Sequence, residues 1–196
     1  MSKQQNSSQS RENLLDAAEQ LFTSRGYTAV TLKDIAKALG IKQASLYYHF
    51  PLGKEDLYVE VMLRHLEHRH TVLKKLIAQA NPDLESCLRQ LGIWLIKQPP
   101  LNGARMILTD LPQLSPEKAV EIESAMYRCA FAPIEDLFIK YRSDLQDNLR
   151  ESPGFIGGTF LSAIEALYTV KRYGFKSDEQ LVTELITLLL QGALKS

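Results

Sequence analysis

Apolar residues recur at helical spacing along nearly the whole chain, and this spacing constrains the fold more than any other feature. Leu14, Ala18 and Leu21 form one such stripe, whereas strict alternation of apolar and polar residues over strand lengths is not seen. Glycine and proline stand where helices have to stop. The pattern therefore predicts an all-α fold of about nine helices.

Length and composition narrow the class of protein. A chain of 196 residues can bury a sizeable core. No run of about 18 apolar residues marks a membrane span, and the polar N-terminus lacks the apolar stretch of a signal peptide. Cys87 and Cys129 stand far apart and suit reduced thiols. We expect a cytoplasmic protein with no membrane partner, no disulfide and no cofactor.

Three helices are expected near the N-terminus. The first carries the opening apolar stripe and stops at Gly26, a residue suited to a left-handed helix end. The second starts at Thr31, where Asp34 completes a capping box, and ends at Gly40. The third lies within residues 42–50. A short turn separates the second helix from the third.

Longer helices follow, and they set the domain organisation. They are expected at 54–80, 83–97, 115–145 with a kink near Pro133, 154–172 and 177–194, the last opening with a Ser177–Gln180 capping box. The order predicts an N-terminal three-helix domain joined by a long helix to a larger C-terminal helical bundle. We expect a disordered arm at 1–10, the small domain at 11–53 and the larger one at 54–196.

Residues 32–46 have the sequence pattern of a helix-turn-helix, in which two short helices are separated by a tight turn that contains glycine. Its core is assigned to Ile35, Ala36, Leu39, Gly40, Ile41, Leu46 and Phe50. The chain has no net charge, but residues 31–54 carry four lysines and a single acidic residue. Any nucleic-acid contact is therefore expected to be local.

Two sequence runs carry a specific family resemblance. The chain resembles the TetR family of bacterial transcriptional regulators in two runs that follow the helix expected at 31–40. These runs are Leu46-Tyr47-Tyr48-His49-Phe50 and Lys54-Glu55-Asp56-Leu57. The match covers about residues 11–58, and beyond it only the helix number and lengths are similar. The turn 51–53, Pro-Leu-Gly, is one residue longer than the commonest linker of that family.

The resemblance implies a regulator of double-stranded operator DNA, a homodimeric repressor that a small-molecule effector releases from a palindromic site. Residues 11–53 would bind DNA, and residues 54–196 would bind the effector and dimerise. Base reading is assigned to the leading end of the third helix, at Lys42, Gln43, Ala44 and Ser45. Contacts to the DNA backbone are assigned to Thr31, Tyr47, Tyr48, His49 and Lys54.

The terminal helix is apolar around much of its circumference, which one buried face does not explain. With the preceding helix it is expected to form a four-helix dimer interface. The residues assigned to it are Leu161, Ile164, Leu167, Tyr168, Leu181, Leu185, Leu188 and Leu189. An oversized monomer core is the alternative.

The remaining residues raise two further possibilities, an apolar effector cavity and a metal site. The candidates for the cavity are Trp94, Met106, Met126, Tyr127, Phe131 and Phe160, although core packing also explains each of them. His65, His68 and His70 raise the question of a metal. No carboxylate or cysteine completes a recognisable set, and a solvated helix face explains these histidines, so we predict no metal site.

Other function classes fit the sequence less well. It contains no phosphate loop, no nucleophile elbow and no HExxH motif, so the chain is not expected to be an enzyme. Two alternatives stay open. One is a DNA-binding regulator without an effector, and the other is an interaction module that keeps the helix-turn-helix only as scaffold.

Overall fold

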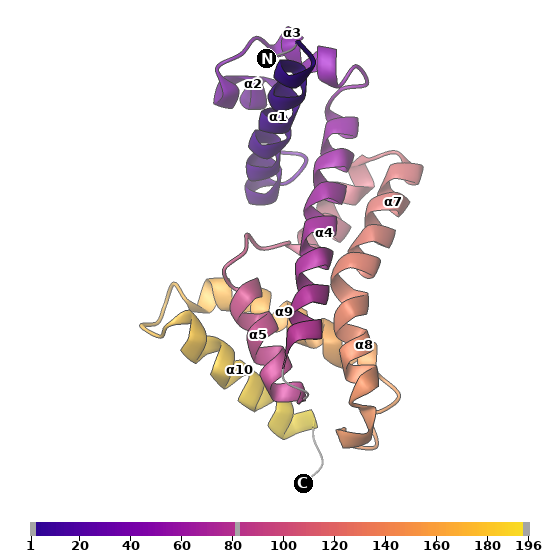
Figure 1. Cartoon of the computed structure of the whole chain (residues 1–196), viewed down its shortest axis with the longest axis vertical. Coiled ribbons are helices and arrows are strands. Elements are labelled where there is room, and N and C mark those ends of the chain that lie inside the picture. The colour runs from indigo at the N-terminus through magenta and orange to yellow at the C-terminus, as the bar shows by residue number, and fades with distance from the viewer. Residues whose placement is uncertain (1–2, 81–82, 194–196) are drawn as a thin grey trace. The chain divides into compact units, whose positions relative to one another are not determined.

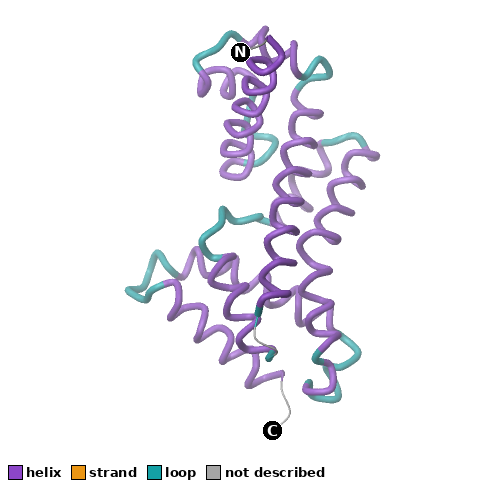
Figure 2. The backbone as a smooth tube through the Cα atoms, viewed as in Figure 1, coloured by secondary structure: helices purple, strands orange, loops and turns teal. Residues whose placement is uncertain are grey.

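The computed structural model describes residues 3–80 and 83–193, and within these ranges the chain consists of helices and loops without strands (Figure 2). The predicted all-α class is confirmed. The chain divides into two compact units, residues 1–66 with 102–125 and residues 67–101 with 126–196. This division follows contacts in space, and a domain boundary after residue 53 remains a proposal.

The first unit begins with the three helices of the helix-turn-helix, α1 (Lys3–Arg25), α2 (Leu32–Leu39) and α3 (Gln43–His49). The expectation of a disordered arm at 1–10 is wrong for residues 3–10, which are helical and belong to α1. Met1 and Ser2, the rest of that segment, lie outside the described residues. Glutamine, asparagine and serine do not break a helix, and adding residues to a formed helix costs far less than nucleating one.

Local signals end the first two helices as predicted. Gly26 follows α1 with φ 82°, and Gly40 follows α2 with φ 66°. Both lie in the left-handed region that glycine adopts without strain. At the start of α2, the Thr31 side chain accepts a hydrogen bond from the Asp34 backbone N–H, while Asp34 accepts one from the Thr31 N–H. The expected capping box is therefore present.

The segment after residue 101 differs from the loop that its Asn-Gly pair indicates. It forms α6 (Gly103–Arg105), a π-helical turn η1 (Met106–Asp110) and a 3₁₀ turn η2 (Leu111–Gln113) before α7 (Pro116–Met126). Its apolar side chains Met106, Leu111 and Leu114 are buried. Burial of these side chains supplies the stabilisation that the local sequence does not indicate.

Two helices agree closely with their expected bounds. Helix α4 spans Lys54–Gln79 and α5 spans Leu84–Leu95. Asp83 caps α5, since its carboxylate accepts the Ser86 N–H at 2.8 Å. The stop expected at residues 81–82 lies outside the described residues.

The helix expected at 115–145 is interrupted near its proline. After α7 comes a π-helical turn η3 (Tyr127–Phe131), then α8 (Ala132–Lys140) and a 3₁₀ turn η4 (Arg142–Asp144). Pro133 has no N–H to donate to the carbonyl of Cys129, four residues earlier. The wider π turn directly before the proline accommodates that missing bond.

The second unit is completed by α9 (Pro153–Val170) and α10 (Asp178–Ala193). Helix α8 packs on α9, and α10 packs on both α5 and α9 (Figure 1). The core between them includes Leu88, Phe138, Phe160, Val182 and Ile186, all of which are fully buried. The predicted end of the last helix near Leu194 lies outside the described residues.

Close approach of α5 and α10 depends on a glycine. A Cβ placed at Gly92 of α5 would lie 2.7 Å from Val182 Cγ1 and 3.1 Å from Ile164 Cδ1. The absence of a side chain at this position lets the two helices meet. Sequence patterning had given Gly92 no role.

Candidate nucleic-acid interface

Helix α3 is anchored by two of its own apolar residues. Leu46 and Phe50 are buried, as are Ile35 and Ala36 of α2, and Leu39 is half-buried. The expected core assignment of Ile41 is wrong, because this side chain is 41% exposed. The left-handed turn at Gly40 redirects the chain just before Ile41, so the side chain faces solvent instead of the space between the helices.

The four residues assigned to base reading lie together on the exposed leading end of α3. Lys42 is the N-cap, with an extended backbone, and Gln43, Ala44 and Ser45 form the first turn of the helix. All four are exposed, whereas Leu46 directly after them is fully buried. This arrangement presents short and polar side chains to solvent from a helix whose opposite face is fixed.

Two tyrosines extend this exposed surface along α3. Tyr48 is 77% exposed, and Tyr47 is also exposed. The Tyr48 ring meets the half-buried His49 ring edge to face, with 5.1 Å between centroids. Their hydroxyl and imidazole groups are the kind of donors that contact phosphates.

Thr31 has a role within the fold that accounts for its position. Its hydroxyl donates to Asp34 Oδ2 at 2.6 Å and accepts from the Asp34 N–H at 3.1 Å. These hydrogen bonds, first of all the one from the Thr31 side chain, lower the pKa of Asp34. A DNA phosphate at this helix start would have to share Thr31 with the carboxylate.

Lys54 reaches an aromatic ring in place of open solvent. Its Nζ lies 4.0 Å from the centroid of the Tyr27 ring, a cation–π contact. Burial lowers the pKa of Lys54. The assigned phosphate contact therefore requires the ammonium to leave Tyr27 or to face both groups.

A buried polar link holds the helix-turn-helix to the segment after residue 101, within the first unit. The fully buried carboxylate of Asp110 accepts the Tyr27 N–H at 3.0 Å, directly after α1. Arg105 donates to the carbonyls of Phe22 and Thr23 at 3.3 and 3.1 Å, and its Nε lies 3.4 Å from Asp110 Oδ2. Neither residue belongs to a recognisable motif, so sequence patterning missed the link.

The residues assigned to a dimer interface fall into two groups. Ile164, Leu167 and Leu181 are buried in the core of the second unit, so within the single chain they offer little surface for the predicted dimer contact. Leu161, Tyr168, Leu185 and Leu189 are partly buried, and Leu188 is 72% exposed. Tyr168 donates its hydroxyl to the Leu95 carbonyl at 3.2 Å.

The residues assigned to an effector cavity also differ in their burial and in the unit to which they belong. Met106 is buried in the first unit, whereas in the second unit Met126 and Phe160 are buried and Trp94 and Phe131 are half-buried. Tyr127 is exposed, and its hydroxyl donates to Glu135 at 2.6 Å. The surface environment of Tyr127 argues against a cavity role.

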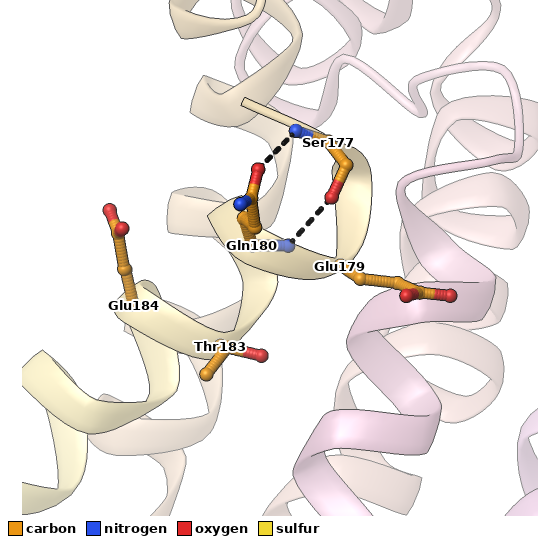
Figure 3. Close-up of a pocket in the computed structure, with 5 residues that line it drawn as sticks. All are labelled: Ser177, Glu179, Gln180, Thr183 and Glu184. Carbon is orange, nitrogen blue, oxygen red and sulfur yellow. Dashed lines mark hydrogen bonds between the residues drawn. The ribbon is translucent and has the colours of Figure 1, made fainter. Parts of the chain in front are cut away.

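One open pocket of the second unit lies at the start of α10, away from these residues. Figure 3 shows its lining, which is Ser177, Glu179, Gln180, Thr183 and Glu184. The predicted capping box is present there. Ser177 N–H donates to Gln180 Oε1 at 2.9 Å, and Gln180 N–H donates to Ser177 Oγ at 3.2 Å. The residues that line it are polar or acidic, whereas an apolar lining is expected for the effector cavity.

A short exposed helix anchored after a glycine turn is the arrangement found in helix-turn-helix motifs. The family model described as bacterial regulatory proteins, tetR family, matches residues 14–61. The HTH-type transcriptional regulator LmrA of Bacillus subtilis (strain 168) is 49% identical over 53 residues, which are 27% of this chain and 28% of that protein.

A second relative is the biofilm operon icaADBC HTH-type negative transcriptional regulator IcaR of Staphylococcus epidermidis. It is 46% identical over 48 residues, which are 24% of this chain and 25% of that protein. The aligned stretch thus spans only about a quarter of each curated relative's length.

Solved structures match over nearly the whole chain. A TetR-family transcriptional regulator from Bordetella parapertussis 12822 has a TM-score of 0.72 at 20% identity, over 93% of this chain and 94% of that one. A TetR transcriptional regulator from Legionella pneumophila has a TM-score of 0.70 at 24% identity, over 91% and 95% of the two chains. At such identities the likeness concerns the fold.

The predicted resemblance is confirmed. Residues 14–61, which contain the helix-turn-helix, match the TetR family model, and the chain shares its all-α fold with solved TetR-family regulators. The matched proteins are named as transcriptional regulators. Among the described residues, no helix is both long and apolar enough to cross a membrane.

Proposed function

We propose that the protein is a homodimeric transcriptional repressor that binds a palindromic operator through α3 and is released by a small-molecule effector. The observation that carries the proposal is the exposed leading end of α3, with Lys42 to Ser45 outward and Leu46 and Phe50 buried. Repression is favoured because the relative IcaR is named a negative regulator. The site of action would be the cytoplasm.

The chemistry of α3 supports base reading in the major groove. Gln43 can donate and accept two hydrogen bonds with adenine, Lys42 can reach guanine or a phosphate, and Ala44 can contact a thymine methyl group. Tyr47, Tyr48 and His49 would hold the backbone alongside, with Thr31 and Lys54 at the helix starts. This division assigns DNA binding to residues 11–53.

The distribution of leucines on α10, the last helix, supports the proposed dimer. Leu185, Leu188 and Leu189 follow one another at helical spacing and stay partly or largely exposed, although the adjoining face of α10 is already buried in the core. A second copy would cover this stripe, with Leu161 and Tyr168 of α9 beside it. Two recognition helices could then read two half-sites about one helical turn apart.

The effector part of the proposal assigns residues 54–196 to ligand binding as well as dimerisation. Among the residues of the second unit, Trp94, Met126, Phe131 and Phe160 remain candidates, since each is buried or half-buried. An effector relieves repression only if it prefers the conformation that does not bind DNA. Screening compounds for thermal stabilisation and for loss of operator binding tests this part separately, and an unresponsive protein would indicate a regulator without effector.

The central experiment selects bound fragments from random DNA and then compares variants on the selected site. Replacing both Lys42 and Gln43 by alanine should remove the preference for that site, at about 1–3 kcal/mol for each base pair read. The variant should remain folded. Lys75→Ala, which removes an exposed lysine of α4 in the second unit, is the charge-matched control and should bind normally.

Two outcomes would overturn the proposal. Unchanged site preference in the Lys42 and Gln43 double variant would remove α3 as the reading helix. Failure of the native protein to enrich any DNA sequence would favour an interaction module that keeps the helix-turn-helix as scaffold.

A further inference from the structure

A mixed cluster of side chains lies in the second unit, apart from the helix-turn-helix. Helix α4 contributes Glu67 and His70, and the π turn η3 contributes Cys129. One carboxylate oxygen, one imidazole nitrogen and the thiol sulfur of these residues all lie within 4.8 Å of one another. Glu67 Oε2 is 3.6 Å from His70 Nδ1. We propose that Glu67, His70 and Cys129 bind a thiophilic divalent cation, Zn²⁺ in the first place.

The donor set selects the type of cation. Zinc takes thiolate, imidazole and carboxylate ligands, whereas Mg²⁺ and Ca²⁺ prefer oxygen alone. A tetrahedral zinc ion with bonds of about 2.0–2.3 Å holds its ligand atoms roughly 3.3–3.8 Å apart. The observed spacing therefore needs a contraction of about 1–1.5 Å at most. Three protein ligands would leave the fourth position for water or another small ligand.

Backbone geometry brings these residues together from distant parts of the sequence. Glu67 and His70 are three residues apart on α4 and thus share a face. Cys129 sits in the π turn that precedes Pro133, and such turns are frequent at functional sites because they reorient a side chain. The sequence pattern indicates no carboxylate or cysteine that would accompany the histidines. The structure supplies both for His70.

A neighbouring arginine fits the role of an outer partner to the ligands. Arg128 Nη1 lies 2.6 Å from Glu67 Oε1, which leaves Oε2 on the side of His70. This hydrogen bond is the main cause of the lowered pKa of Glu67. Partners that hold and orient a ligating carboxylate are a regular part of metal sites. The Cys129 side chain is fully buried, and burial raises the pKa of its thiol, so a bound cation has to displace a proton there.

Cobalt offers a direct spectroscopic test on the full-length, tag-free, reduced protein. Titration with Co²⁺ should give a thiolate-to-metal charge-transfer band together with the visible bands of tetrahedral cobalt. Addition of one equivalent of Zn²⁺ per chain should abolish both. Zinc affinity is then measured by competition with a chromophoric chelator.

Variants identify the ligands. Cys129→Ser should abolish the charge-transfer band, and it should weaken zinc binding by more than about 100-fold, as should His70→Gln and Glu67→Gln. Arg128→Ala should weaken zinc binding by about 10-fold through its effect on Glu67. His68→Gln, on the exposed face of α4, and Cys87→Ser should leave the band and the affinity unchanged.

The outcomes separate a metal site from a hydrogen-bonded cluster. A native protein with no charge-transfer band, or one whose zinc affinity is the same in Cys129→Ser, contains only the hydrogen-bonded cluster. Circular dichroism of each variant verifies that it is folded. Because no DNA enters the experiment, its failure would leave the proposed DNA-binding function untouched.

Discussion

At the scale of single residues, the carboxylate of Asp110 is the buried charge on which the first unit depends. It accepts the Tyr27 N–H and faces Arg105, whose guanidinium in turn donates to carbonyls at the end of α1. Gly26 makes room for it, since a Cβ there would lie 3.0 Å from Asp110 Oδ1. A buried charge is tolerated only when its polar partners are in place.

Asp110→Ala should therefore destabilise the protein. The change leaves the Tyr27 N–H without its acceptor and Arg105 without its carboxylate, which we expect to lower the unfolding free energy by about 1–3 kcal/mol. Urea denaturation followed by circular dichroism measures the loss. Asp136→Ala, at an exposed position of α8, is the control and should change stability by less than about 0.5 kcal/mol. Equal stability of both variants would mean that the buried link contributes nothing.

Lys54 is the residue at which a structural role and a DNA-binding role compete. If Lys54 neutralises a phosphate, Lys54→Ala should weaken operator binding for all sequences alike. The slope of log affinity against log salt should also become shallower by about 0.9. Lys75→Ala should leave the slope unchanged. A slope in Lys54→Ala equal to that of the native protein would assign Lys54 to its contact with Tyr27 alone.

At the scale of elements, the turn between α2 and α3 sets the direction of the recognition helix. Gly40 ends α2 with φ 66°, and its N–H donates to the Lys37 carbonyl at 3.2 Å. Nothing lies within 4 Å of the place where a Cβ would sit. The requirement for glycine is thus one of backbone conformation and not of space.

Gly40→Ala tests whether glycine is required here for its backbone conformation and not for lack of space. The left-handed conformation costs an alanine about 1–2 kcal/mol, so the unfolding free energy should fall by that amount. Gly40→Asn should lose less, since asparagine tolerates this region better. Chemical denaturation of the two variants gives the comparison. If alanine were as stable as glycine, the turn would have to relax to another conformation.

The start of α7 is tied to α4 by a charge that titrates. Glu55 accepts the Ser115 N–H at 2.6 Å, with Lys118 Nζ 3.6 Å from its other oxygen. The backbone hydrogen bond from Ser115 is the main cause of the lowered pKa of Glu55. A folded pKa below the unfolded one means that the stabilisation is present above the ordinary value of 4.5 and is lost as the pH falls through the folded value.

Glu55→Gln should accordingly flatten the acid limb of the stability curve. We expect the native protein to lose more stability than the variant as the pH falls below about 4.5, while the two curves run parallel near neutrality. Urea midpoints measured across this range show the difference. Superimposable acid limbs would mean that Glu55 keeps its ordinary pKa in the folded chain.

At the scale of the whole molecule, the proposed dimer depends on apolar surface that the single chain leaves exposed. In α10, Val182 and Ile186 are fully buried, while Leu188 is 72% exposed on the stripe that it shares with Leu185 and Leu189. A largely exposed leucine beside two half-buried ones on the same side of a helix is consistent with a surface that a partner covers.

Leu188→Lys should shift the protein from dimer to monomer, because a charge would have to be buried in the interface. Thr187→Lys is the matched control. Its position is also exposed, but it lies about 100° away from Leu188 on the helix, on the side opposite to Leu189, and should leave the dimer intact. Sedimentation or light scattering over a range of concentrations gives the oligomeric state. A stable Leu188→Lys dimer would place the interface elsewhere.

The sequence by itself determined the features that depend on neighbours along the chain. Gly26 and Gly40 end helices because of their own backbone freedom, and Thr31 and Asp34 cap α2 from three residues apart. Helical periodicity also separated Leu46 and Phe50, which are buried, from Tyr47, Tyr48 and the residues at 42–45, which are exposed. For these reasons the recognition helix and the all-α class could be predicted.

The tertiary structure decided what depends on residues far apart in the chain. Packing made residues 103–113 helical, turned Ile41 outward, and placed Ile164, Leu167 and Leu181 in the chain's own core. It also brought Cys129 to His70 through a π turn. Burial is a property of three-dimensional packing, and an apolar stripe in the sequence does not say which neighbour covers it. The exposed end of α3 could be predicted from the sequence, whereas the neighbours that side chains of the second unit contact could not.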